Sequence, residues 1–151
     1  MSNGVYPVWW DTTITIYNKY EDTQTHLITW FRTVVDTGSF WKYVKDTISI
    51  NNTVLESKKT ICRIRESEKF LEKYVWIGKT TEQKANYFTL GPGDIIVKGT
   101  VTDAINEYAV GSRSSDLLTK YRALQGCMEI DLVSLNVGPG RCEPHYRVEG
   151  N

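Results

Sequence analysis

The sequence predicts a mainly β protein, a small antiparallel β-barrel or sandwich with one short helix and one long excursion. Apolar and polar residues alternate with a period of two in several separate segments, which is typical of half-buried strands. About seven or eight such segments follow one another at fairly regular spacing, as in small barrels and sandwiches. Only one stretch has a convincing helical pattern. The length of 151 residues fits a single domain covering residues 1–151, with the excursion at about 66–88.

The first strand is expected at residues 12–20, where Ile14 and Ile16 share one face and threonines occupy the other. Residues 27–35 are apolar on both faces, which indicates a central strand or one covered on its outer side. We interpret residues 36–38 (Asp-Thr-Gly) as the turn that closes this hairpin. The chain then continues into an aromatic segment at residues 40–50, and residues 51–59 are polar and predict a loop.

Strand patterns resume at residues 60–65, where Cys62 and Ile64 share one face and Arg63 and Arg65 the other. The excursion follows. After it, a strand at residues 95–97 lies between Gly93 and Gly99, and the helical pattern occupies residues 115–121. Glycines at both ends fix where the strand turns, because glycine reaches left-handed dihedrals at little cost.

Near the C-terminus, Met128, Ile130 and Leu132 alternate with acidic residues, but Val133 and Leu135 are apolar too. This change of parity predicts a β-bulge near Leu132 or a change of strand partner. Residues 145–150 predict the last strand. Alternation across these segments predicts one common core formed by Ile14, Ile16, Ile64, Ile95, Val97, Ile130, Leu132 and Val148.

The excursion is charged but contains an apolar island, which would be a liability if left bare in solution. We therefore expect the excursion to project from the barrel and to contact another subunit. The apolar N-terminal segment also supplies two tryptophans. The candidate subunit-interface residues are Tyr74, Val75, Trp76, Ile77, Trp9 and Trp10.

Composition argues against several functions. Eighteen basic and eighteen acidic residues cancel, so no overall field attracts the chain to nucleic acid or an anionic membrane. Three cysteines without a C-x-x-C spacing indicate buried thiols in a reducing compartment. The apolar N-terminal segment is too short for a membrane span or signal core. We expect a soluble protein made inside a cell, with no membrane partner.

No motif supports catalysis. Cys142 and His145 have a spacing that some zinc sites use, but zinc needs three or four ligands, so we predict no metal and no cofactor. Asp103 and Glu107 form a possible carboxylate pair of a kind that most often belongs to a solvated turn. We therefore expect a protein that is not an enzyme. An enzymatic alternative would need a pocket converging on Asp94, Asp103 or His145.

The order of the segments resembles small structural proteins of tailed bacteriophages and prophages, the minor capsid or head-tail connector proteins of the neck. Framework segments carry the resemblance over residues 12–150, with the excursion least matched. They are the strand at residues 13–20, Trp30-Phe31-Arg32-Thr33, Ser39-Phe40-Trp41, Ile61-Cys62-Arg63-Ile64-Arg65, the block from Gly93 to Gly99, the helix at residues 115–121 and the strand at residues 145–150.

The resemblance implies a virion protein, assembled in the bacterial host, that forms a six- or twelve-fold ring. It implies a head-completion (stopper) connector that joins portal and adaptor proteins to the tail, while genome DNA passes through without sequence-specific binding. A tail terminator, usually with more helix, is the nearest alternative. An OB-like module that binds single-stranded nucleic acid or carbohydrate is the alternative of another class, and a strongly basic groove would favour it.

Overall fold

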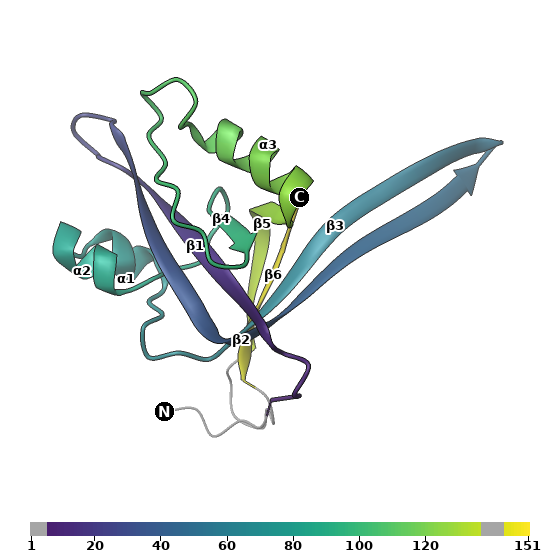
Figure 1. Cartoon of the computed structure of the whole chain (residues 1–151), viewed down its shortest axis with the longest axis horizontal. Coiled ribbons are helices and arrows are strands. Elements are labelled where there is room, and N and C mark those ends of the chain that lie inside the picture. Colours follow the sequence, from purple (N-terminus) through teal and green to yellow (C-terminus); the bar gives the residue numbers. More distant parts are fainter. Residues whose placement is uncertain (1–5, 137–143) are drawn as a thin grey trace.

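A closed six-stranded antiparallel barrel forms the body of the protein in the computed structural model, which describes residues 6–136 and 144–151 (Figure 1). The mainly β fold is thereby confirmed. Around the barrel the strand order is β1-β2-β3-β6-β5-β4, and β4 pairs back to β1. The strands are β1 (Thr12–Glu21), β2 (Ile28–Ile50), β3 (Thr53–Arg65), β4 (Ile95–Lys98), β5 (Cys127–Asn136) and β6 (His145–Gly150).

Strand β2 is one continuous strand of 23 residues. The predicted turn at residues 36–38 is therefore wrong. Thr12 pairs with Ser39 whereas Ile14 pairs with Val35, so β2 carries extra residues at this point and forms a bulge against β1. Gly38, at φ +92°, allows it. A glycine inside a strand marks a bulge as readily as a turn, which explains the error.

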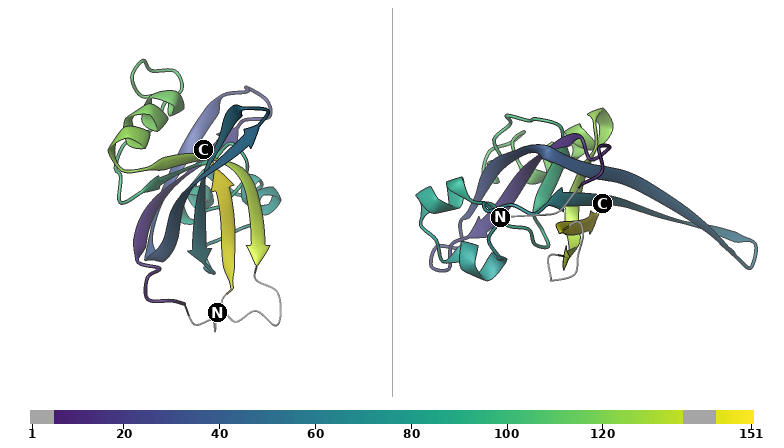
Figure 2. Two further views of the ribbon diagram at one scale, coloured as in Figure 1. Left: turned by 90° about the vertical axis from the view of Figure 1, so that its right-hand side faces the viewer. Right: turned by 90° about the horizontal axis from the view of Figure 1, so that it is seen from below.

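Strands β2 and β3 form a long hairpin whose outer half leaves the barrel (Figure 2). Residues 51–59 were predicted as a loop, and this prediction is wrong because β3 begins at Thr53. The turn consists of Asn51 and Asn52, whose φ angles are +49° and +64°. Two consecutive residues with positive φ are typical of a tight type I′ hairpin turn, a conformation that asparagine tolerates.

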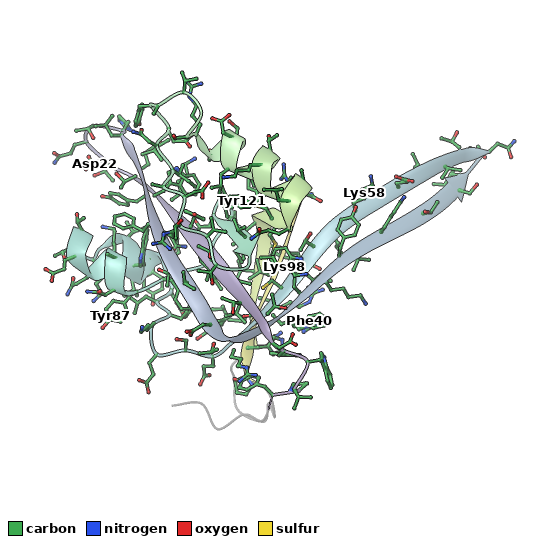
Figure 3. The ribbon with its side chains drawn as sticks, viewed as in Figure 1. Asp22, Phe40, Lys58, Tyr87, Lys98 and Tyr121 are labelled. Atoms are coloured by element: carbon green, nitrogen blue, oxygen red, sulfur yellow. The ribbon has the colours of Figure 1, made fainter. Side chains whose placement is uncertain are left out.

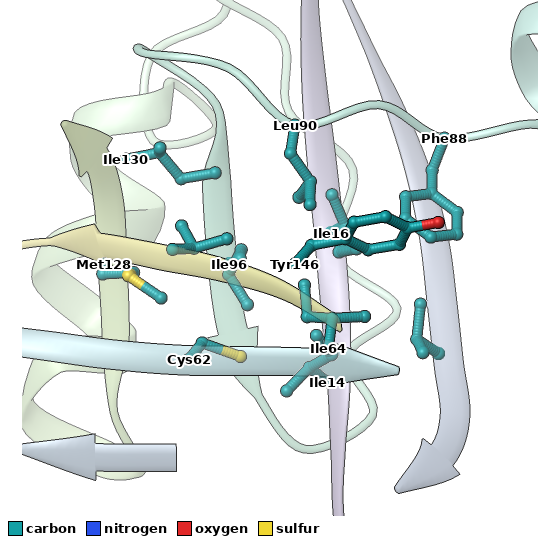
Figure 4. Packing of buried hydrophobic residues seen from close by; sticks show 12 residues of the cluster. Ile14, Ile16, Cys62, Ile64, Phe88, Leu90, Ile96, Met128, Ile130 and Tyr146 are labelled. Carbon is teal, nitrogen blue, oxygen red and sulfur yellow. The ribbon is translucent and has the colours of Figure 1, made fainter. Parts of the chain in front are cut away.

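The barrel interior is filled by side chains from all six strands and from the segment before β4 (Figure 4). Ile14, Ile16, Ile64 and Val148 are fully buried there, as predicted, and Ile130 nearly so. The other buried members of this cluster are Val35, Cys62, Phe88, Leu90, Ile96, Met128 and Tyr146.

A second apolar cluster lies outside the barrel, beneath helix α3 (Ser114–Leu124). Ile95 and Val97 belong to this cluster, so the prediction that they share the first core is wrong. Strand β4 is buried on both faces: Ile96 points into the barrel, and its two neighbours pack under α3. The predicted short helix is α3. Its buried residues are Leu117, Leu118 and Tyr121.

Strand β5 shifts register against β6 between Ile130 and Leu132, which confirms the predicted bulge. The shift returns Val133 to the side of the barrel core, where it packs partly buried against the first cluster. Leu132 is exposed, so its assignment to the core is wrong.

The excursion folds back onto the domain and forms two further short helices, α1 (Lys73–Ile77) and α2 (Thr81–Asn86). Trp76 of α1 is fully buried and packs edge-on against Tyr20 of β1 and Phe31 of β2. The expectation that the apolar island projects from the barrel is therefore wrong for its largest side chain. The barrel itself covers the indole, and the hairpin of β2 and β3 is the part that projects.

Candidate functional site

The most exposed feature of the fold is the outer half of the β2–β3 hairpin, residues 44–59, here called the arm. Within it the two strands pair only with each other, because β1 pairs with β2 no farther than Ser39 and β6 pairs with β3 only from Thr60. Figures 1 and 3 show the arm extending well beyond the barrel. Each strand of the arm therefore has one edge without a neighbouring strand among the described residues.

The arm is amphipathic. Directly opposed residues of an antiparallel pair share a face, and successive residues alternate between faces. Ile48 opposes Leu55, and Ile50 lies two residues farther along the same face. These three side chains are 53%, 51% and 52% exposed, respectively. They form an apolar patch on the outer part of the arm that nothing in the described chain covers; nearer the barrel, Val44 on the same face is opposed by Lys59.

The opposite face of the arm is mainly polar and charged. The carboxylate of Glu56 forms ion pairs with Nζ of Lys45 at 3.2 Å and with Nζ of Lys58 at 3.6 Å. Thr47 and Ser49 continue this face towards the tip, where Val54 is its apolar member. The arm thus carries the alternation of a sheet that is covered on one side and solvated on the other.

A cleft of about 670 Å³ opens between β2 and the segment that follows β3. The apolar side chains of Val35, Phe88 and Tyr146 line it, and all three are buried in the barrel. Its rim is acidic, because Asp36 and Glu66 outnumber the cation Lys69 among the described lining residues. The cleft therefore combines an apolar floor with a net negative rim.

One wall of this cleft is a strand edge that is open among the described residues. From Ile28 to Val35, β2 pairs with β1, and its pairing with β3 begins only at Ser39. The part of the edge near Phe31 lies beside α1, whereas residues 33–37 border the cleft. The hydroxyl Oγ1 of Thr33 is buried there without a hydrogen-bond partner in the described structure. This edge could accept a further strand.

The arm and the cleft lie on different sides of the barrel. In Figures 1 and 2 the arm leaves in one direction, while the chain after β3 runs the other way, towards α1 and α2. The cleft borders that departing segment. One molecule therefore cannot fill its own cleft with its arm in this conformation.

The six residues predicted for a subunit interface are divided by the structure. Trp76 and Trp10 are buried within the domain. Tyr74 and Ile77 are exposed and line a shallow apolar hollow, Val75 is half-buried, and Trp9 is exposed. Tyr74, Ile77 and Trp9 thus remain available for an interface, which stays a prediction for them.

A buried polar network joins the barrel to α1 at the position of Asp94. Its carboxylate accepts hydrogen bonds from the Lys19 backbone amide at 2.9 Å and from Asn18 Nδ2 at 3.1 Å. Lys73 Nζ lies 3.2 Å from both carboxylate oxygens. Burial raises the pKa of Asp94, and Lys73 works against this shift. The network holds the helix against the strand, which is a structural role.

The other acidic candidates lie apart from Asp94. Asp103 accepts hydrogen bonds from Lys120 at 2.9 Å and Tyr121 at 2.8 Å, and these two bonds hold its pKa below the ordinary value. Glu107 accepts one from the backbone of Ser114 at 2.7 Å. Both therefore anchor the connection before α3. His145 lies in β6, beside Arg63. Among the described residues, Asp94, Asp103 and His145 do not line a common pocket.

Within residues 6–136 and 144–151, no group of three or more metal-ligating side chains gathers. Cys142 lies outside the described residues, so its pairing with His145 is not tested. Cys62 and Cys127 are buried free thiols, and burial raises the pKa of Cys127 to about 12. None of the helices in the described ranges is long and apolar enough to cross a bilayer.

The arm was missed in the sequence, although a signal for it exists. Residues 47–50 and 53–56 alternate in register on either side of Asn51-Asn52, and a two-residue asparagine turn between alternating runs is a hairpin signal. Because Lys58 and Lys59 make the end of this stretch polar, residues 51–59 were interpreted as a loop. The cleft has no such signal, because its walls come from segments far apart in the chain.

Comparison with known proteins gives a family but no activity. Among curated proteins and among solved structures, none matches the chain. A family described as "Family of unknown function (DUF6751)" matches residues 9–151, which include every strand and helix described above. The chain therefore belongs to the DUF6751 family of unknown function.

Proposed function

We propose that the protein is a structural subunit of a ring in the neck of a tailed-phage particle. In this role it acts as a head-completion (stopper) connector between the portal and adaptor proteins and the tail. The observation that carries the proposal is the arm, whose apolar face has no partner in the described chain. Two-stranded ribbons are only marginally stable alone, and exposed apolar patches mark interaction surfaces. The choice of a tailed-phage particle rests on the framework resemblance over residues 12–150.

A ring role also suits the arrangement of the two surfaces. Head-to-tail contacts close into a ring only if each subunit presents two different faces and the rotation between copies divides the circle. The arm and the cleft are two such faces. We expect a ring of about six or twelve copies. A net charge of zero suits a ring through which DNA passes without sequence-specific contact.

A tail terminator is the alternative position in the same particle. The three described helices have 5, 6 and 11 residues. This small helical content supports the connector position, since terminators usually carry more helix. An enzymatic role has less support, because the polar clusters around Asp94 and Asp103 fix helices and loops to the barrel.

The particle itself provides the test. Mass spectrometry of purified virions should detect the protein, and particles made without its gene should have filled heads that do not join tails. Absence of the protein from virions, or normal joining without it, would contradict the proposal. A matched pair of variants tests the arm: Ile48→Asp should abolish joining, whereas Ser49→Asp, on the opposite face, should leave it intact.

A second function has one specific observation in its favour. At the root of the arm, a hollow of about 760 Å³ is lined by Trp41, Tyr43 and four cations, Lys58, Lys59, Lys98 and Arg122. Aromatic and basic side chains together suit single-stranded nucleic acid. However, Glu56 pairs with Lys58 and Glu149 pairs with Lys59, which reduces the free positive charge, and Arg122 donates a hydrogen bond to the carbonyl oxygen of Asn151.

Fluorescence anisotropy with a labelled oligothymidylate tests this second function. Binding that weakens steeply with salt and is lost in Lys98→Glu would favour a nucleic-acid module. Lys79→Glu, at a lysine outside this hollow, is the charge-matched control.

A further inference from the structure

We infer that the arm of one copy docks in the cleft of the next copy, where it lies along the open edge of β2 at residues 33–37. The occupant of the cleft is thus a second copy of this chain. The inference deepens the proposed function and rests on it for the ring, but the contact itself is defined by the chemistry of the two surfaces.

The first step concerns apolar area. The arm presents Ile48, Ile50 and Leu55, each about half exposed. The cleft presents an apolar floor formed by buried residues of the barrel, with the partly exposed Val34 at its wall. Joining the two surfaces removes from water mainly the exposed apolar area of the arm and of Val34, at about 25 cal/mol per Å².

The second step concerns the backbone. The cleft wall formed by residues 33–37 is a strand edge, and each strand of the arm also has an open edge. Strand addition at such an edge satisfies backbone donors and acceptors on both partners, while alternate side chains enter neighbouring pockets. The arm is therefore a type of element that this wall can accept by strand addition.

The third step concerns charge. In the arm, three lysines stand against Asp46 and Glu56, and Lys59 shares Glu149 with Arg147, which together leaves one net positive charge. On the cleft, Asp36 and Glu66 stand against Lys69, which leaves one net negative charge. Opposite signs favour this pairing over contact between two arms or between two clefts, and they steer the approach.

The fourth step concerns geometry. Because the arm and the cleft lie on different sides of the barrel, a molecule that inserts its arm into a neighbour still offers its own cleft to a third. Such contacts are head-to-tail and repeat from copy to copy, which is the arrangement that a ring requires.

Cross-linking between two single-cysteine variants tests the contact. Both are made in the full chain with Cys142→Ser, so that the buried Cys62 and Cys127 are the only other thiols. Copies with Ile48→Cys are mixed with copies with Val34→Cys and treated with a short bismaleimide. The mixture is examined as concentrated protein, and the same pair is examined in purified particles. We expect the mixed dimer to form at least about ten times faster than with Ser49→Cys in place of Ile48→Cys, since Ser49 faces away.

Equal rates for Ile48→Cys and Ser49→Cys in both samples would overturn the inference, and so would a cross-link from Ile48→Cys to a different virion protein. The proposed function fails separately. If concentrated protein gives the mixed dimer but virions lack the protein, the contact stands and the neck role does not. If virions contain the protein without this cross-link, the neck role stands and the contact does not.

Discussion

Strands β2 and β3 build two regions of opposite character from one continuous hairpin. In the barrel, they contribute buried residues such as Val35, Cys62 and Ile64. In the arm, the same two strands present Ile48 and Leu55 to solvent. The two strands pair with each other without a break from Ser39 to Ile50, through both regions. The difference is therefore tertiary: an apolar strand face contributes to monomer stability only where another layer covers it.

The largest expected effect comes from removing the same apolar group in the two regions. Ile64→Ala in the barrel should lower the free energy of unfolding by about 2–5 kcal/mol, because it opens a cavity in a packed interior. Ile48→Ala in the arm should lower it by less than about 0.5 kcal/mol. Urea titration of each purified variant measures both values. Similar losses at the two positions would show that the arm is covered in solution.

The junction between the regions should be nearly as sensitive. A Cβ at Gly38 would lie 2.2 Å from the carbonyl oxygen of Trp10, and φ there is +92°. Gly38→Ala should therefore cost about 2–4 kcal/mol, from the left-handed backbone and the clash together.

Gly93 is the matched control for the junction, because its φ is +91° but nothing lies within 4 Å of an added Cβ. Gly93→Ala should cost only about 1–2 kcal/mol, from the backbone alone. Equal costs in thermal or chemical unfolding would indicate that Trp10 moves aside without penalty.

Removing the lysine of an ion pair should also cost more stability in the barrel than in the arm. Lys73→Met leaves the buried carboxylate of Asp94 without its cation and should cost about 1–3 kcal/mol. Lys45→Met in the arm removes a pair whose side chains are 50% and 43% exposed, and it should cost less than about 1 kcal/mol. Adding Asp94→Asn to Lys73→Met should recover part of the loss. No recovery would mean that Lys73 acts through packing on Trp76 instead.

The smallest effect should come from the layer of α3, whose polar contacts are partly exposed. Lys120 and Tyr121 depress the pKa of Asp103, so the ionised carboxylate stabilises the fold above the pKa of the unfolded state. This contribution should be present at about pH 7 and lost as the pH falls below about 4. The melting temperatures of the wild type and of Asp103→Asn should therefore differ near neutral pH and converge in acid. A constant difference would exclude ionisation as its cause.

Local patterns were sufficient to predict much of the barrel. The alternation around Ile14 and Ile16 predicts β1, the change of parity near Leu132 predicts the bulge, and residues 115–121 predict α3. These features depend on near neighbours in the chain. The assignment of Ile95 and Val97 to the barrel core failed because both faces of β4 are covered, and sequence alternation does not tell which layer covers each face.

The candidate site was harder to predict. Trp76 was expected to project, but Tyr20 and Phe31 receive its indole from distant parts of the chain. A buried tryptophan beside charged residues has the same local sequence whether a barrel or a partner covers it. The cleft depends on where β2 pairs with β1 and β3, a long-range property that no segment encodes alone.

The tip of the arm has a consequence for handling the protein. Residues 47–55 contain no charged residue and no proline, and short uncharged β segments with open edges are prone to stack into fibrils. Lysines at positions 45 and 58 flank this segment and act as gatekeepers against such stacking. A free subunit stored at high concentration should therefore form amyloid-like fibrils from this tip, and a dye that reports cross-β structure should detect them sooner in Lys45→Ala.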